Sequence, residues 1–186
     1  MSHSLKKITK TTHNIELDLK YATKNNVTGD IIYKNAECYL HEKALKSLEL
    51  AIELARNLGL RFKIFDAFRP IEAQWILWNH IKNPHYISHP EQGSVPHCRG
   101  VAIDLTLIDN NDQELDMGTE FDDFSDQSHH ANVKISKDAQ KNRLILLGIM
   151  TLAGWDFYKN EWWHYQLFNA RDYTIISDKE SNIGIM

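Results

Sequence analysis

Three stretches of the chain predict helices. In residues 41–58 the apolar positions recur every three or four residues, and Gly59 follows where a C-terminal glycine would end the helix. A proline opens the second stretch, 70–81, and fits the first turn of a helix, where its missing N–H costs nothing. Ser136 is a typical N-cap for the third helix, which we expect over 137–153.

Other stretches have the patterns of strands. Residues 15–21 alternate apolar and charged side chains, which predicts a half-buried strand. The apolar runs 61–68 and 101–108 predict buried strands, and 155–168 predict a final hairpin. The chain lacks the alternating strand–helix rhythm of a parallel sheet. The pattern therefore favours an α+β fold with a small, mainly antiparallel sheet flanked by helices, in a single domain spanning 1–186.

Composition narrows the class of protein. With 21 Lys and Arg against 25 Asp and Glu, the net charge is −4, so the chain lacks the basic footprint of a nucleic-acid-binding protein. Cys38 and Cys98 are too few for a disulfide scaffold and indicate reduced thiols. The longest uncharged stretch, 144–155, is too short to span a bilayer, and no secretory signal opens the chain. We therefore expect a cytoplasmic protein without membrane partners; the pattern leaves its oligomeric state open.

Three residues form a candidate metal site: His97 and Asp104 in the segment HCRGVAIDLTL, and His164 in EWWHY. Two imidazoles and one carboxylate suit one zinc ion per chain and leave a fourth position open, as a catalytic site requires. Asp104 lies within an otherwise apolar strand, where a carboxylate needs a partner. Gly100 allows the chain to turn between His97 and that strand, so that both ligands can converge.

Two further residues could supply the chemistry of hydrolysis. Glu161 precedes His164 by three residues, and on a regular strand that spacing would place the two side chains on opposite faces. We therefore expect Glu161 to lie just before the strand or on a bulge, where it could exchange protons with a water activated by the metal. Arg69, in FDAFRP, could stabilise a developing oxyanion, or it could form only a salt bridge at a helix entry.

These motifs resemble a known family. HCRGVAIDLTL resembles the S-x-H-x-x-G-x-A-x-D signature of the D-alanyl-D-alanine dipeptidases, the VanX-type zinc peptidases, and EWWHY resembles their E-x-x-H signature. The segments LKYATKNNVTG, FDAFRP and DMGTEFDDFSDQSHH are similar to further family segments and occur in the same order. The resemblance runs from about Leu19 to Leu167 and implies the small α+β sheet that these peptidases share with the hedgehog signalling domain.

The resemblance also implies site roles. It makes His97, Asp104 and His164 the zinc ligands, Glu161 the general base and acid, and Arg69 the group that steadies the tetrahedral intermediate. It adds Asp122 as the residue that holds the substrate's ammonium group and Tyr21 as a substrate-binding residue. The sequence adds support for Asp122, because the stretch 100–133 contains nine acids and no Lys or Arg. Asp123 could serve in its place, and Tyr21 could simply pack in the core.

One position departs from the family pattern. The signature serine that precedes the first ligand by two residues is replaced here by Val95, with Ser94 one place away. This leaves open whether a serine contacts the substrate and how strictly the pocket selects it.

The candidate residues and the family resemblance together imply three possible functions. The leading hypothesis is hydrolysis of D-alanyl-D-alanine to free D-alanine by a water that zinc activates. The second is a related peptidoglycan carboxypeptidase or endopeptidase acting on longer stem peptides. The third is a zinc-binding module without catalysis, which the presence of Glu161 and Arg69 disfavours. A cysteine-nucleophile enzyme is a distant fourth, because Cys98 has no base beyond its neighbour His97.

Overall fold

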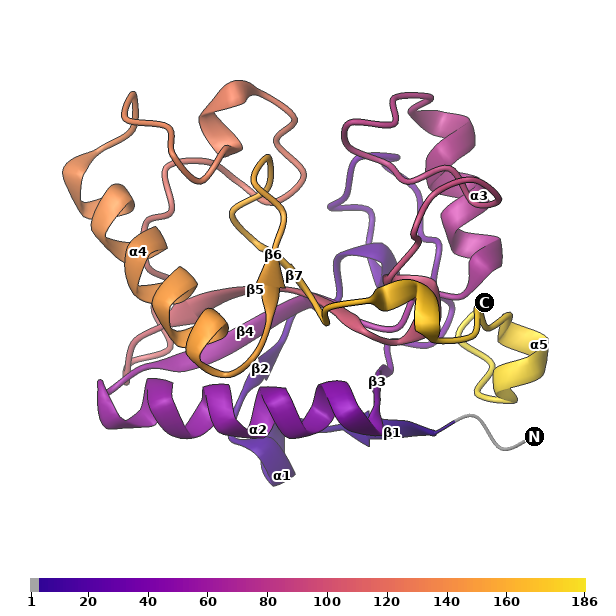
Figure 1. Cartoon of the computed structure of the whole chain (residues 1–186), viewed down its shortest axis with the longest axis horizontal. Coiled ribbons are helices and arrows are strands. Elements are labelled where there is room, and N and C mark those ends of the chain that lie inside the picture. Colours follow the sequence, from indigo (N-terminus) through magenta and orange to yellow (C-terminus); the bar gives the residue numbers. More distant parts are fainter. Residues whose placement is uncertain (1–3) are drawn as a thin grey trace.

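The structure is a computed structural model and describes residues 4–186 (Figure 1). The α-helices and strands, in chain order, are β1 (Leu5–Ile8), α1 (Lys10–His13), β2 (Glu16–Leu17), β3 (Cys38–His41), α2 (Glu42–Asn57), β4 (Arg61–Asp66), α3 (Ile71–His80), β5 (Ala102–Ile108), α4 (Lys137–Leu152), β6 (Asp156–Phe157), β7 (His164–Gln166) and α5 (Asp178–Ser181). Within residues 4–186, no helix combines the length and the apolar character that crossing a bilayer requires.

The strands form two sheets. A five-stranded sheet has the order β2-β4-β5-β7-β6, and a two-stranded sheet pairs β1 with β3. Only the short β2–β4 pairing is parallel among the described strands; the others are antiparallel. The predicted class, an α+β fold with a mainly antiparallel sheet and flanking helices, is therefore confirmed.

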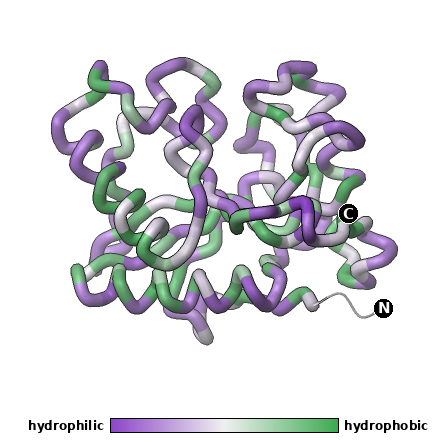
Figure 2. Tube along the Cα trace, viewed as in Figure 1, coloured by the Kyte–Doolittle hydropathy of each residue, from purple (hydrophilic) through white to green (hydrophobic). Residues whose placement is uncertain are grey.

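The two long helices form as the sequence predicts. The buried residues of α2 are Ala44, Leu48, Ala51 and Ala55, and apolar positions alternate with hydrophilic ones along this helix in Figure 2. Gly59 follows α2 with φ +70°, the left-handed conformation that glycine adopts without strain. At the start of α4, the Ser136 hydroxyl accepts a hydrogen bond from the Ala139 N–H at 3.0 Å. Both helices contact each other and the sheet.

β5 is the centre of the fold. All seven of its residues are buried, because β4 and β7 cover its edges and other elements cover both faces. The main core surrounds β5 and the inner faces of α2 and α4. A second core lies around α3 and includes Tyr21, Tyr33 and Ile185 near the C-terminus. The functional groups described below lie where these two cores meet.

The prediction of a strand over 15–21 is largely wrong. Only Glu16 and Leu17 pair with β4, and the chain then turns into a short 3-10 helix at Lys20–Ala22. The N–H groups of Ala22 and Thr23 donate to carbonyls three residues earlier instead of to a neighbouring strand. This turn sends the Tyr21 side chain into the second core.

Candidate active site

Asp104 and His164 stand opposite each other on paired strands. They are Cα partners in the antiparallel ladder between β5 and β7, so their side chains lie next to each other on one face of the sheet. His97 reaches the same place from a short 3-10 helix, His97–Arg99, that ends at Gly100 with φ +66°. The expectation that Gly100 makes the turn between His97 and β5 is confirmed. All three side chains are buried.

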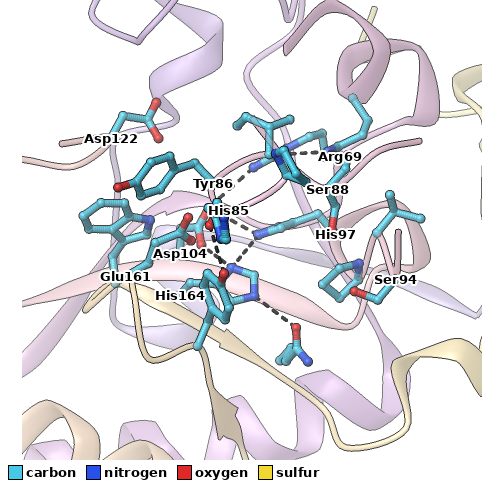
Figure 3. Close-up of a pocket in the computed structure, with 18 of the residues that line it drawn as sticks. Arg69, His85, Tyr86, Ser88, Ser94, His97, Asp104, Asp122, Glu161 and His164 are labelled. Carbon is cyan, nitrogen blue, oxygen red and sulfur yellow. Dashed lines mark hydrogen bonds and ion pairs between the residues drawn. The ribbon is translucent and has the colours of Figure 1, made fainter. Parts of the chain in front are cut away.

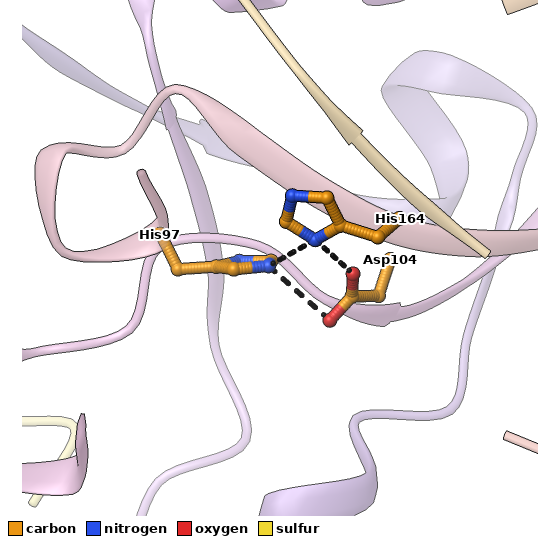
Figure 4. A group of neighbouring side chains, drawn as sticks. All are labelled: His97, Asp104 and His164. Carbon is orange, nitrogen blue, oxygen red and sulfur yellow. Dashed lines mark hydrogen bonds and ion pairs between the residues drawn. The ribbon is translucent and has the colours of Figure 1, made fainter. Parts of the chain in front are cut away.

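The three side chains present a compact set of donor atoms (Figure 4). His97 Nε2 lies 3.1 Å from His164 Nδ1 and 3.3 Å from Asp104 Oδ2, and His164 Nδ1 lies 3.0 Å from Asp104 Oδ1. Ligands of tetrahedral zinc at about 2.0–2.1 Å lie roughly 3.3 Å apart. The separations therefore match the edges of such a site. The two nitrogens and the oxygen fit a divalent metal ion in both chemistry and spacing.

The charge balance also favours a cation here. Asp66, Asp104 and Glu161 are buried, and Arg69 is the buried basic side chain that contacts two of these acids. Burial would raise the pKa of Asp104, but His97 and His164 outweigh it and hold that pKa well below the usual range. Asp104 therefore stays a carboxylate, which is the form that binds metal.

Glu161 lies in the turn directly before β7, as one of the two expected arrangements requires. The His164 N–H donates to the Glu161 carbonyl at 3.3 Å, which closes the turn and lets both side chains face the same pocket. Burial raises the pKa of Glu161 to about 8; the negative charges of Asp104 and Asp122 add to this, and His164 opposes it. A carboxyl group with a pKa near neutrality can both accept and donate a proton.

Arg69 is held by side chains on three sides. Its Nε donates to Asp66 Oδ2 at 2.8 Å, and its Nη1 donates to Gln74 Oε1 at 2.9 Å. Its Nη2 lies 3.5 Å from Asp104 Oδ2, which places the guanidinium beside the candidate metal ligands. The salt bridge considered from sequence does form, but it orients Arg69 within the pocket instead of leaving it at the helix entry.

Asp122 and Tyr21 meet on another wall of the pocket. The Tyr21 hydroxyl lies 3.3 Å from Asp122 Oδ2, and the Arg69 guanidinium lies 4.9 Å from the Tyr21 ring centre. Desolvation of the Asp122 carboxyl raises its pKa to about 7; the charge of Asp104 adds to this, and Arg69 opposes it. Asp123, the alternative from sequence, instead accepts the Ser125 N–H at 2.8 Å in its own loop.

These groups line one cavity of about 360 Å³ (Figure 3). The segment between α3 and the 3-10 helix at His97 covers part of it. Tyr86 of this segment stacks on Phe124, with ring centres 4.7 Å apart, and the Tyr158 hydroxyl donates to the His85 carbonyl at 2.9 Å. Ser94 and Val95 both line the cavity, and Val95 has φ +41°, an unusual conformation for a β-branched residue.

Sequence reasoning missed the side chains that hold the others in place. Asp66 joins Arg69 to the Tyr33 hydroxyl, which donates to Asp66 Oδ1 at 2.9 Å. Asp66 ends an apolar strand, so the same signal that singled out Asp104 could have found it. Gln74 also donates to the Ser88 carbonyl at 2.7 Å, and nothing in its local sequence marks that contact. Arg99, close to His97 in the sequence, donates to the Ser94 and Tyr173 carbonyls.

The fold and the site together define a metallopeptidase. A family model described as D-ala-D-ala dipeptidase matches residues 1–182. The D-alanyl-D-alanine dipeptidase of Escherichia coli (strain K12) is 42% identical over 168 residues, which are 90% of this chain and 86% of that protein. The D-alanyl-D-alanine dipeptidase of Enterococcus faecium is 34% identical over 175 residues, covering 83% of this chain and 87% of that protein. The chain belongs to the D-ala-D-ala dipeptidase family.

Proposed function

We propose that this protein hydrolyses D-alanyl-D-alanine to two molecules of free D-alanine, using one zinc ion per chain. The observation that carries the proposal is the convergence of a two-histidine, one-aspartate donor set with Glu161, Arg69 and Asp122 in one cavity. The relatives' names supply the substrate, and the family match spans nearly the whole chain.

His97, Asp104 and His164 would hold the zinc ion. When bound, zinc would lower the pKa of a coordinated water to about 7 and polarise the carbonyl oxygen of the scissile amide. The donor spacing described above supports this assignment. Three protein ligands also leave a coordination position for substrate or water, which a purely structural zinc site does not.

Glu161 would move the proton in both halves of the reaction. As a carboxylate it accepts a proton from the attacking water, and as a carboxylic acid it donates that proton to the nitrogen of the leaving D-alanine. The pKa of about 8 makes the protonated form of the buried Glu161 side chain accessible near neutral pH. A positioned general acid–base of this kind contributes about 10²–10⁴-fold to the rate.

Arg69 would stabilise the negative oxygen that forms as the carbonyl carbon becomes tetrahedral. Its contacts with Asp66 and Gln74 fix the guanidinium before substrate arrives, so little reorganisation is needed in the transition state. The Nη2 group faces the ligand side of the pocket, next to Asp104, where the carbonyl would lie.

Asp122 would bind the free ammonium group of the dipeptide, with Tyr21 orienting the carboxylate. Desolvation of the Asp122 carboxyl and the charge of Asp104 both disfavour the ionised form of Asp122. A substrate ammonium would remove this penalty by forming a charge-assisted hydrogen bond. A peptide whose amino group is blocked would leave the carboxylate without its partner, so this wall favours free dipeptides over longer stem peptides.

The protein would act on the free dipeptide in the cytoplasm. Cys38 and Cys98 are both buried and unpaired, which fits a reducing compartment. Fractionation of the producing cells, with the protein followed by antibody, tests this placement.

The decisive experiment compares D-alanyl-D-alanine with its N-acetylated form. Zinc-loaded protein should release D-alanine from the free dipeptide and leave the acetylated form intact. Glu161→Gln should lower the rate by about 10²–10⁴-fold while zinc binding is retained. Cleavage of both substrates at similar rates would replace the proposal with a peptidoglycan carboxypeptidase or endopeptidase. A protein that binds zinc but cleaves neither would be a zinc-binding module.

A further inference from the structure

The two histidines of the site present different ring nitrogens to Asp104. His97 points its Nε2 inward and His164 points its Nδ1 inward (Figure 4). Each therefore has one ring nitrogen directed away from the donor set. In a neutral imidazole only one nitrogen carries a proton, and a metal binds the other. The hydrogen-bond partner of the outward nitrogen thus decides whether the inward one is available.

The outward nitrogens have different kinds of partner. His97 Nδ1 lies 2.7 Å from the Ala67 carbonyl oxygen, which can only accept, so the proton of His97 sits on Nδ1. His164 Nε2 lies 3.2 Å from Oε1 of Gln166. The first partner belongs to the backbone and survives any substitution at position 67 that keeps the fold. The second is a side chain, and substitution can remove it.

The strand itself places Gln166 beside His164. Both residues lie on β7, two positions apart, and therefore on the same face. Gln166 pairs with Ala102 on β5, so the residue opposite the glutamine carries only a methyl group. Gln166 is only half-buried and also lines the pocket.

We propose that Gln166 is a positioning residue of the metal centre, whose side-chain oxygen accepts the Nε2–H of His164 and so leaves Nδ1 free to bind the ion. This inference rests on the proposed metal site. Without the acceptor, the proton could move to Nδ1 and block the ligand, or the ring could turn. Partners of this kind typically contribute about 10- to 100-fold to metal affinity.

Zinc affinity tests the proposal by a readout that does not depend on catalysis. The dissociation constant is measured for the purified full-length protein by competition with a chromogenic chelator. Gln166→Met keeps the length of the side chain but removes the acceptor, and it should bind zinc about 10- to 100-fold more weakly. Gln166→Glu keeps an acceptor and should bind at least as tightly as the parent. Gln113→Met, an exposed glutamine beyond the far end of β5, is the matched control and should match the parent.

A second measurement identifies the ligating nitrogen directly and needs no variant. The parent protein, with isotopically labelled histidine, is loaded with spin-active cadmium. Scalar coupling should link the metal to Nδ1 of His164 and to Nε2 of His97. Coupling to Nε2 of His164 would overturn the proposal, as would unchanged zinc affinity in a folded Gln166→Met protein. If both measurements agree with the proposal but no dipeptide is cleaved, the proposed function fails and the role of Gln166 stands.

Discussion

Asp104 and His164 stand on the paired strands β5 and β7, whereas Asp122 stands on the irregular segment between β5 and α4 (Figures 1 and 3). We call Asp104 and His164 the sheet side of the site, and Asp122 with Tyr21 the loop side. The sheet side takes its geometry from the β ladder, which is buried and paired along its length. The loop side is positioned by side-chain contacts. Its Asp122 has φ +61°, a left-handed backbone conformation that is uncommon outside glycine.

The sheet side and the loop side meet different requirements: precise ligand spacing on the first, and entry and release of substrate on the second. A metal site tolerates ligand distances only within about 0.2 Å of their ordinary values. The ladder register helps, because it makes Asp104 and His164 direct neighbours on one face of the sheet. A substrate-binding wall must admit and release a molecule, which an irregular segment allows more readily. We therefore expect changes on the sheet side to remove the metal and changes on the loop side to alter substrate binding alone.

The largest expected effect comes from breaking the sheet side. Asp104→Asn removes the charged ligand and should lower zinc affinity by more than ~100-fold. Loss of a direct ligand should cost more than loss of a residue that only hydrogen-bonds a ligand, which typically costs about 10- to 100-fold. Hydrolysis should fall with it at any substrate concentration. Chelator competition and the rate at saturating dipeptide check this, with Asp109→Asn at the far end of β5 as the control. Full activity in a metal-free Asp104→Asn protein would show that hydrolysis does not need the ion that Asp104 is proposed to bind.

A smaller and more selective effect should follow from changing the loop side. Asp122→Asn keeps the shape but loses the charge, so kcat/KM for D-alanyl-D-alanine should fall by about 10- to 100-fold, the value of a hydrogen bond to a charged group. Zinc affinity should stay at the parent value. The preference for the free over the N-acetylated dipeptide should shrink as well. An equal fall in kcat/KM for the free and the N-acetylated dipeptide would mean that Asp122 does not bind the ammonium group.

A third effect concerns how the stability of the segment between β5 and α4, which also carries Asp122, depends on pH. His130 packs against Phe157 and Tyr165, and burial lowers its pKa to about 4; the charge of Arg143 adds to this. An unfolded histidine titrates near 6.5, so between these values the unfolded chain binds more protons and the free energy of unfolding falls as pH falls. The loss from this residue should reach about 2 kcal/mol at pH 5.

Denaturant unfolding of the metal-free protein between pH 7 and pH 5 measures this loss. His130→Phe preserves the aromatic contacts and should flatten the pH dependence relative to the parent. His80→Gln, at an exposed position at the end of α3, is the control. An identical slope in His130→Phe and the parent would assign the acid sensitivity to other groups.

The same division explains what the sequence could and could not predict. The caps at Ser136 and Gly59 and the apolar run of β5 are local signals, and the helices and strand formed accordingly. His97 and Asp104 lie seven positions apart, so the turn at Gly100 predicts that they converge. His164 is grouped with them by the chemistry of the donor set and by the family resemblance, because it lies 60 positions beyond Asp104. The loop side is different, because the turn at Tyr21 and its contact with Asp122 join residues 101 positions apart. Alternation of apolar and charged residues could not distinguish that turn from a strand.

The pairing of Asp104 with His164 has a further consequence for synthesis. These residues are neighbours in the ladder but 60 positions apart in the chain. Because a polypeptide leaves the ribosome from its N-terminus, His97 and Asp104 emerge well before the third ligand. A nascent chain or a fragment that stops before β7 holds an incomplete donor set. At the proposed metal site, capture of the ion would therefore be a late event, and a tightly metal-loaded molecule would be one whose translation passed the final hairpin.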